Sequence, residues 1–246
     1  METIEVPDIL IAKGGQLHSM RDQKVWKNST GHTFGVGSGV VKNGILYTLR
    51  VPTLLTMQTF VPNPADPIGT VVNLTDERDG IVYRCIKMAD GRWWMGENLR
   101  YDIEGSTYYN NDVANLATYG RLYNWQKAQD TAPDNWSVPN DNEWKVLEMA
   151  LGMTQADADT SGTWRESGGV GMKLKEGGSS GLNLLLGGYE LNGSYDGLSS
   201  NGYYWTSMES HSLSAWHRTL YSDNTGVYRA WSDKASRFSI RLILNQ

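Results

Sequence analysis

The chain has 246 residues, a length that suits one large domain or a small domain followed by a medium one. Its net charge of −5 and the absence of a long Lys/Arg run argue against nucleic acid as a partner, and no apolar run is long enough to span a membrane. Cys85 is the single cysteine, which excludes an intrachain disulfide, so stability must come from packing.

Residues 1–61 are expected to form a small β-rich domain. The first residues, Met1–Pro7, lack a basic start and an apolar core, so no secretory signal is visible in this chain. Val40–Tyr47 predicts a hairpin, because its central Asn43-Gly44 readily takes the positive φ values of a tight turn. A domain of this size is marginal alone. We expect it either to assemble with copies of itself, for instance as a trimer, or to rest on the domain that follows.

A proline-rich connector is expected over residues 62–72. Pro62, Pro64 and Pro67 exclude a central strand or a helix interior and favour a stiff extended segment. Only one of the ten tryptophans, Trp26, precedes it, so the two sides differ in core chemistry. Residues 73–246 are therefore expected to form the second domain.

The second domain is predicted to open with a strand pair. Gly80–Met88 alternates apolar and polar residues, Ala89–Gly91 forms a turn, and Arg92–Met95 returns. Cys85 falls in the first of these strands with no His near it in sequence. A buried, inert thiol is therefore expected rather than a nucleophile.

Two helices are expected next. The first covers Leu122–Ala128. The second begins after Asn140, a good N-cap, and Glu143 completes a capping-box pattern. Apolar residues then recur at helical spacing up to Leu151, while Leu182–Leu244 shows only short strands and turns. This order predicts an α+β fold.

The segment Ser194–Ser236 indicates a binding surface. About half of its residues are Ser, Tyr, Asn, Asp or His, a mixture that gives adaptable hydrogen bonding and rigid contact area, as in antibody paratopes. Trp205, Trp216 and Trp231 are interspersed among them and are expected to face the core.

The two-residue period of a strand assigns the other side chains to the outer face. If Trp216 and Leu220 point inward, then residues 217, 219 and 221 point outward, and Val227 inward implies Tyr228 outward. Phe238, Ile240, Leu242 and Leu244 form an expected buried stripe. With the neighbouring loops, the candidate ligand-binding residues are His211, Ser212, His217, Thr219, Tyr221, Asp223, Asn224, Tyr228 and Ala230.

Eight motifs of the second part occur in the order seen in the Fibrobacter succinogenes major paralogous domain family. They are WWMGENL (93–99), GRLYNW (120–125), WSVPNDNEW (136–144), GMKLKE (171–176), LLLGGYE (184–190), GYYWTSMES (202–210), SAWHRTL (214–220) and RFSIRLI (237–243). The chain resembles this family from about Asn73 to Leu244, and it departs from the family pattern at Leu185–Gly188 and at Leu242. The resemblance implies a C-type lectin-like fold with two helices and short antiparallel strands, shared by formylglycine-generating enzymes and by the variable proteins of diversity-generating retroelements.

The likeness to retroelement variable proteins implies that the candidate residues are diversified. Replacing adenines in Asn codons can yield Tyr, His, Asp, Ser, Thr, Ala, Gly or Arg but not Trp. All nine candidate residues are reachable in this way, whereas the three tryptophans of the segment are not. The alternative is that polar loops are commonly rich in Ser, Asn and Asp.

The function expected from these observations is non-enzymatic ligand binding or adhesion. A phage tail receptor-binding protein, located in the virion tail, is the leading carrier, and an exported bacterial surface adhesin or glycan-binding protein is the alternative. The ligand is expected to be a cell-surface protein or glycan. A formylglycine-generating oxidase is disfavoured, because that chemistry uses a Cys pair with copper and this chain has Cys85 alone.

No catalytic residue, metal or cofactor is expected. His211 and His217 do not have a recognised zinc spacing. Asp76, Glu77 and Asp79 could bind calcium, although a solvated turn is the more common arrangement.

Overall fold

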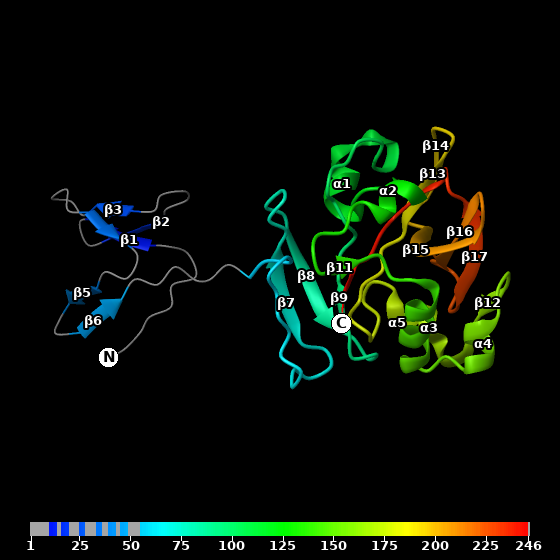
Figure 1. The fold of residues 1–246 in the computed structure, drawn as a ribbon, viewed down its shortest axis with the longest axis horizontal. Helices are drawn as coiled ribbons and strands as arrows, with labels where there is room; N and C mark the ends of the chain where they lie inside the picture. Colours follow the sequence, from blue (N-terminus) through cyan, green and yellow to red (C-terminus); the bar gives the residue numbers. More distant parts are fainter. Residues whose placement is uncertain are drawn as a thin grey trace. The chain divides into compact units, whose positions relative to one another are not determined.

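A computed structural model describes residues 55–245 throughout and, before them, the strand residues 10–13, 16–19, 25–27, 33–35, 39–42 and 45–48 (Figure 1). The chain divides into two compact units, Met1–Leu54 and Leu55–Gln246. Met1–Pro7, on which the expectation about a secretory signal was based, lie outside the described residues.

The described residues of the first unit form three antiparallel strand pairs. The pairs are β1 (Leu10–Lys13) with β2 (Gln16–Ser19), β3 (Val25–Lys27) with β4 (Thr33–Gly35), and β5 (Gly39–Lys42) with β6 (Ile45–Thr48). Lys42 pairs with Ile45, which confirms the hairpin predicted around Asn43-Gly44; these two turn residues lie outside the described ones.

The second unit is α+β, as predicted, and contains two sheets. The larger has the order β10 (Tyr123–Asn124), β18 (Arg237–Phe238), β13 (Gly187–Leu191), β15 (Asn201–His211), β16 (Ser214–Tyr221), β17 (Val227–Asp233), β12 (Trp164–Arg165), with β14 (Ser194–Leu198) paired to β13. The smaller has the order β11 (Trp136–Ser137), β19 (Ile243–Leu244), β9 (Trp93–Met95), β8 (Val82–Lys87), β7 (Val71–Thr75). Antiparallel pairing of β8 with β9 confirms the first predicted strand pair.

Five α-helices occur in this unit, where two were predicted. They are α1 (Val113–Tyr119), α2 (Trp125–Gln129), α3 (Asp141–Ala150), α4 (Gln155–Asp159) and α5 (Val170–Leu174), with 3-10 turns at Tyr109–Asn111 and Ser167–Gly169. Figure 1 shows α1 and α2 on one side of the strands and α3, α4 and α5 on the other. None of the helices in residues 55–245 is long and apolar enough to cross a membrane.

The helix starts follow local chemistry. Asn140 and Glu143 form the predicted capping box at the start of α3, with each side chain accepting from the other residue's backbone N–H. The first predicted helix begins later than expected, because Tyr123 and Asn124 pair with β18 and the Asn124 side chain then caps α2. Tyr123 and Asn124, which helical spacing assigned to a helix, therefore belong to a strand.

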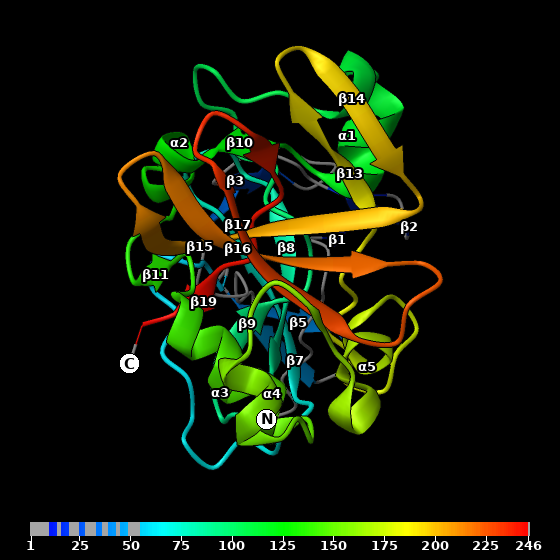
Figure 2. The same ribbon diagram turned by 90° about the vertical axis from the view of Figure 1, so that its right-hand side faces the viewer.

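The larger sheet separates two apolar clusters. One contains Trp205 and Ala215 together with Phe238; the other contains Leu220 and Val227 with the apolar side of α3. The central strands β15, β16 and β17 thus have side chains buried on both faces, and Figure 2 shows α3, α4 and α5 beneath them. The predicted buried stripe of Phe238, Ile240, Leu242 and Leu244 is confirmed.

The second unit begins before the expected connector. Met57 is fully buried, and its carbonyl accepts from Trp136 Nε1 at 2.8 Å. The proline-rich segment is also bound to this unit, because Lys87 Nζ donates to the carbonyls of Pro64 (3.0 Å) and Asp66 (2.8 Å). The residues expected to connect two domains therefore lie along the second unit itself.

Candidate functional site

Strand β16 organises the region where the candidate residues lie. It pairs with β15 on one side and β17 on the other, both antiparallel. Its eight residues span about 25 Å at the usual rise of a strand. We call the end at Tyr221 the loop end and the end at Ser214 the hairpin end.

The predicted alternation along β16 holds, but the predicted exposure does not. Thr219 pairs with Tyr228 and His217 with Ala230, which places these residues on one face. His217 and Thr219 are nevertheless buried, with 3% and 2% of their surfaces exposed. The reason is Phe238, whose ring lies 5.1 Å from that of His217 and covers this part of the face. The outward assignment of His217 and Thr219 was wrong.

Both ring nitrogens of His217 lie within hydrogen-bonding distance of side-chain hydroxyl groups. Its ring nitrogens lie 3.1 Å from Thr219 Oγ1 and 3.0 Å from Ser232 Oγ. Burial, together with the nearby charge of Arg218, lowers the pKa of His217 to about 3. A neutral, enclosed imidazole of this kind supports packing and is not accessible to a ligand.

The three tryptophans of the segment have three different environments. Trp205 is fully buried, as predicted, and its Nε1 donates to the Tyr123 carbonyl at 2.8 Å. Trp216 is only half-buried, under the guanidinium of Arg229 at 4.0 Å, and Trp231 is 54% exposed. The core assignment was wrong for these two, because they lie at the hairpin end, beyond the strand residues that α3 covers.

An aromatic cluster lies at the loop end. It consists of Trp164, Tyr221 and Tyr228, all half-buried, from strands β12, β16 and β17. The Trp164 ring meets those of Tyr221 and Tyr228 edge-on, at 4.9 and 5.2 Å between centroids. Tyr228 also donates to the Gly162 carbonyl at 3.0 Å. Trp164 was not among the candidate residues, because its pairing with Tyr228 joins distant parts of the chain.

The loop Ser222–Gly226, which follows the aromatic cluster, has its backbone fixed by one side chain. Lys175 Nζ donates to the carbonyls of Tyr221 (2.9 Å), Ser222 (3.3 Å) and Asn224 (2.9 Å). Asn224 has a structural role of its own, since its Oδ1 accepts from Gly226 N at 2.8 Å.

Glycine is required where this loop meets α5. The Gly226 carbonyl approaches Gly171 so closely that a Cβ at Gly171 would lie 2.0 Å from it. A side chain at Gly171 would therefore push the loop away from the helix.

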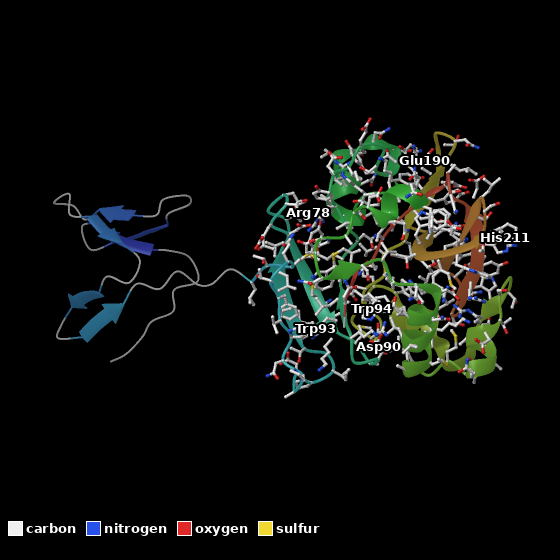
Figure 3. The ribbon with its side chains drawn as sticks, in the orientation of Figure 1. Arg78, Asp90, Trp93, Trp94, Glu190 and His211 are labelled. Atoms are coloured by element: carbon white, nitrogen blue, oxygen red, sulfur yellow. The ribbon has the colours of Figure 1, made fainter. Side chains whose placement is uncertain are left out.

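The remaining candidates lie at the hairpin end. His211 and Ser212 are exposed, and the His211 ring lies 5.4 Å from that of Trp231. Figure 3 shows His211 at the outer edge of the unit, on the side of β16 and β17. The candidate residues therefore do not form one contiguous patch. Tyr221, Asp223, Asn224 and Tyr228 gather at the loop end, and His211 and Ser212 lie at the other end of β16.

A buried group of charges fixes these strands on α3. Asp141 and Glu148, two turns apart on α3, bind three buried arginines from the sheet. Arg165 forms a bidentate pair with Glu148 at 2.7 Å, and Arg218 bridges Glu148 and Asp141, each at 2.7 Å. Arg229 binds Asp141 at 2.7 Å.

The protonation of Asp141 follows from these contacts. Burial alone would raise the pKa of this carboxyl group, but the hydrogen bonds and charges of the two arginines, Arg218 and Arg229, lower it to about 2.

We call Asp141, Glu148, Arg165, Arg218 and Arg229 the buried charge group. Sequence reasoning missed it, because arginines in a polar segment give no sign of burial.

Other candidate chemistry has structural partners. The Asp76 carboxylate, considered for calcium, is fully buried and holds Arg78 through two oxygens, at 2.6 and 2.9 Å. Cys85 is buried, and burial raises the pKa of its thiol far above the ordinary value. In the part of the chain that the structure describes, no three acidic, His or Cys side chains are grouped so that they could hold a metal ion.

Comparison with known protein families finds a match within the second unit. The model of the Fibrobacter succinogenes major domain matches residues 86–243, which include both sheets' central strands and all five helices. No curated protein and no solved structure matches the chain. Since the match covers well over half of the residues, the chain belongs to the Fibrobacter succinogenes major domain family.

Proposed function

We propose that this protein is a non-enzymatic recognition module and that the loop end of β16 is its ligand-binding surface. The aromatic cluster supplies rigid contact area, and Ser222, Asp223 and Thr225 supply adaptable polar groups beside it. This composition is typical of surfaces that bind proteins. The observation that carries the proposal is the combination of partly exposed aromatic rings with a short polar loop whose backbone is fixed by Lys175.

The way in which the loop is fixed favours variation of its side chains. Lys175 binds main-chain carbonyls, which every residue type presents equally. The side chains of Ser222, Asp223 and Thr225 make no hydrogen bond within the described residues. Replacing them would therefore leave the loop conformation unchanged. This supports the hypothesis that the segment is diversified, which requires a near-copy of its coding DNA, altered only at adenines, close to the gene.

We further propose that the fold is C-type lectin-like and that the carrier is a phage tail fibre or an exported bacterial adhesin. Both carriers present binding modules at a cell surface. Assembly of the chain, for instance into a trimer, would raise avidity without new contacts. The oxidase alternative lacks support, because Cys85 is enclosed and has no cysteine partner in the sequence.

Binding of the full chain to arrays of purified bacterial surface proteins and glycans tests the proposal. The variant Asp223→Ala/Thr225→Ala/Tyr228→Ala should lose binding to any array target at least about tenfold, as expected when an aromatic anchor is removed. The matched control is His211→Ala/Ser212→Ala/Leu213→Ala at the hairpin end, which should bind like the parent. If the control loses binding and the loop-end variant keeps it, the ligand binds at the hairpin end of β16, and the proposal is wrong.

A further inference from the structure

A groove of about 800 Å³ lies beside α5, between the loop Lys175–Ser179, the end of α1 and the turn that precedes β15. Its volume falls within the range of about 300–1,000 Å³ that small-molecule sites occupy. It shares Ser222 with the loop-end surface and otherwise has its own lining, which includes Tyr119, Lys173, Ser179 and Ser199.

The charge of this groove is unusual for an acidic protein. Lys173 and Lys175 both line it, against the single acidic side chain of Glu176. Within residues 55–245, neither lysine forms an ion pair with a carboxylate; the lysines that do so are Lys145 and Lys234. Lys173 Nζ donates to the Leu151 carbonyl at 2.7 Å, which leaves donors free, since an ammonium has three. The groove therefore carries positive charge that the protein does not neutralise.

Hydroxyl groups form much of the remaining polar lining. Ser179 and Ser222 have side-chain hydroxyls without a hydrogen-bond partner in the described chain, and Tyr119 Oη lies 3.1 Å from Ser199 Oγ. Each hydroxyl can both donate and accept. Such groups match a ligand that itself presents many hydroxyls.

Apolar side chains and exposed glycine backbone form the rest of the groove wall. Met172 is 57% exposed, and Leu184 and Leu186 also line the groove. At Gly169 and Gly177, a Cβ would meet nothing within 4 Å, so the wall here is bare backbone beside open space. A saturated sugar ring, with apolar C–H faces and polar edges, fits a surface of this kind.

We propose that this groove is a second binding site and that it takes an acidic glycan, meaning a chain of hydroxyl-rich rings that carry carboxylates. The ammonium group of Lys173, which has free donors, binds a carboxylate, and Lys175, whose three donors are taken by the loop carbonyls, adds its positive charge to the attraction. The serine and tyrosine hydroxyls bind those of the sugar, and the apolar wall contacts the ring faces. The site differs from the loop-end surface in both position and ligand chemistry.

Titration of the full chain with tri-galacturonate, followed by amide chemical shifts in NMR spectra, tests the proposal. Saturable shifts are expected at Lys173, Gly177, Ser179 and Ser199, and added salt should weaken binding. Maltotriose, a neutral sugar of equal length, should bind at least about tenfold more weakly, because it lacks the carboxylates.

Two variants, each of which removes one positive charge, separate the loss of a charge in the groove from a general change in net charge. Lys173→Gln removes the charge but keeps a donor for the Leu151 carbonyl, and it should weaken tri-galacturonate binding about tenfold. Lys127→Gln on α2, outside the groove, should leave binding unchanged. The loop-end triple variant should also keep tri-galacturonate binding, so the groove proposal and the proposed function can fail independently of each other.

Any of four results would overturn the proposal. One is equal binding of maltotriose and tri-galacturonate, which would remove the role of charge. Another is inorganic phosphate binding at the same residues as tightly as tri-galacturonate, which would make the groove a simple anion site. The third is an equal loss of affinity in Lys173→Gln and Lys127→Gln, and the fourth is the absence of any saturable shift.

Discussion

Trp205 and Trp231 have the same side chain but lie in opposite environments. Trp205 is fully enclosed and hydrogen-bonded, whereas Trp231 is 54% exposed beside His211. Both lie on central strands of the larger sheet. Trp205 pairs with His217 and Trp231 with Trp216, so the two indoles lie at neighbouring positions but on opposite faces of the sheet. The face, and what covers it at that point, therefore decides which indole contributes to the core.

Replacing each tryptophan by alanine should separate these roles. Trp205→Ala should lower the free energy of unfolding by about 3–5 kcal/mol, because it leaves a cavity and an unpaired carbonyl. Trp231→Ala should change it by about 0.5 kcal/mol or less, as for most surface positions. Urea denaturation followed by circular dichroism measures both. Equal losses would show that the assigned burial is wrong.

His217 should make the stability depend on pH. Its folded pKa of about 3 lies below the ordinary value of 6.5, so the unfolded chain binds a proton that the folded chain does not. Stability should therefore be complete above about pH 6.5 and fall by about 1.4 kcal/mol per pH unit below it, until about pH 3.

Between pH 6.5 and pH 4 the contribution of Asp141 stays nearly complete, because it is lost as the pH falls through the ordinary pKa of 3.8 toward the folded pKa of about 2. His217→Gln should lose the slope that His217 contributes, which leaves only that of other groups, such as Asp90, whose pKa is raised by burial. His211→Gln, which alters an exposed ring, should keep the slope of the parent. A parent without any slope would contradict the enclosed, neutral His217.

At the scale of elements, the buried charge group joins α3 to three strands of the larger sheet. Three guanidinium groups meet two carboxylates, and each carboxylate oxygen has at least one arginine partner. Arg218 donates to both carboxylates, so its removal breaks the link between the two pairs and takes a donor from two buried acceptors, which costs far more than the loss of a surface pair.

Arg218→Met should therefore lower the free energy of unfolding by about 3–5 kcal/mol. Lys234→Met, which breaks the exposed pair with Glu209, is the control and should cost about 1 kcal/mol or less. Thermal and urea unfolding of both variants gives the comparison. A loss for Arg218→Met no larger than that of the control would mean that the group does not hold the sheet on α3.

Elements with local signals could be predicted from the sequence, and those without them could not. The capping box of α3 and the hairpin of β8 and β9 depend on residues close in the chain. Helix α1 has no buried residue and hence no apolar stripe to reveal it. The burial of His217 depends on Phe238, and the aromatic cluster depends on Trp164, both contributed by other strands. Alternation along one strand gives the face of a residue, but not what covers that face.

At the scale of the whole molecule, the second unit combines a fixed scaffold with two different surfaces. The buried charge group and the two apolar clusters hold the strands, while the loop end and the groove beside α5 present exposed side chains. The net charge is −5, yet the groove is lined by two lysines without carboxylate partners within residues 55–245. A division of this kind lets recognition change while the fold stays constant.

The most direct test of recognition by variable side chains on a fixed backbone is a saturation scan of residues 214–233, read out as resistance of the folded chain to protease. Ser222, Asp223 and Thr225 should accept nearly all residue types, whereas Arg218 and Gly226 should accept almost none. In a Lys175→Met background the same loop should become protease-sensitive, because its three carbonyls lose their common donor. Loop positions as restrictive as Arg218, or a loop indifferent to Lys175→Met, would contradict display on a fixed backbone.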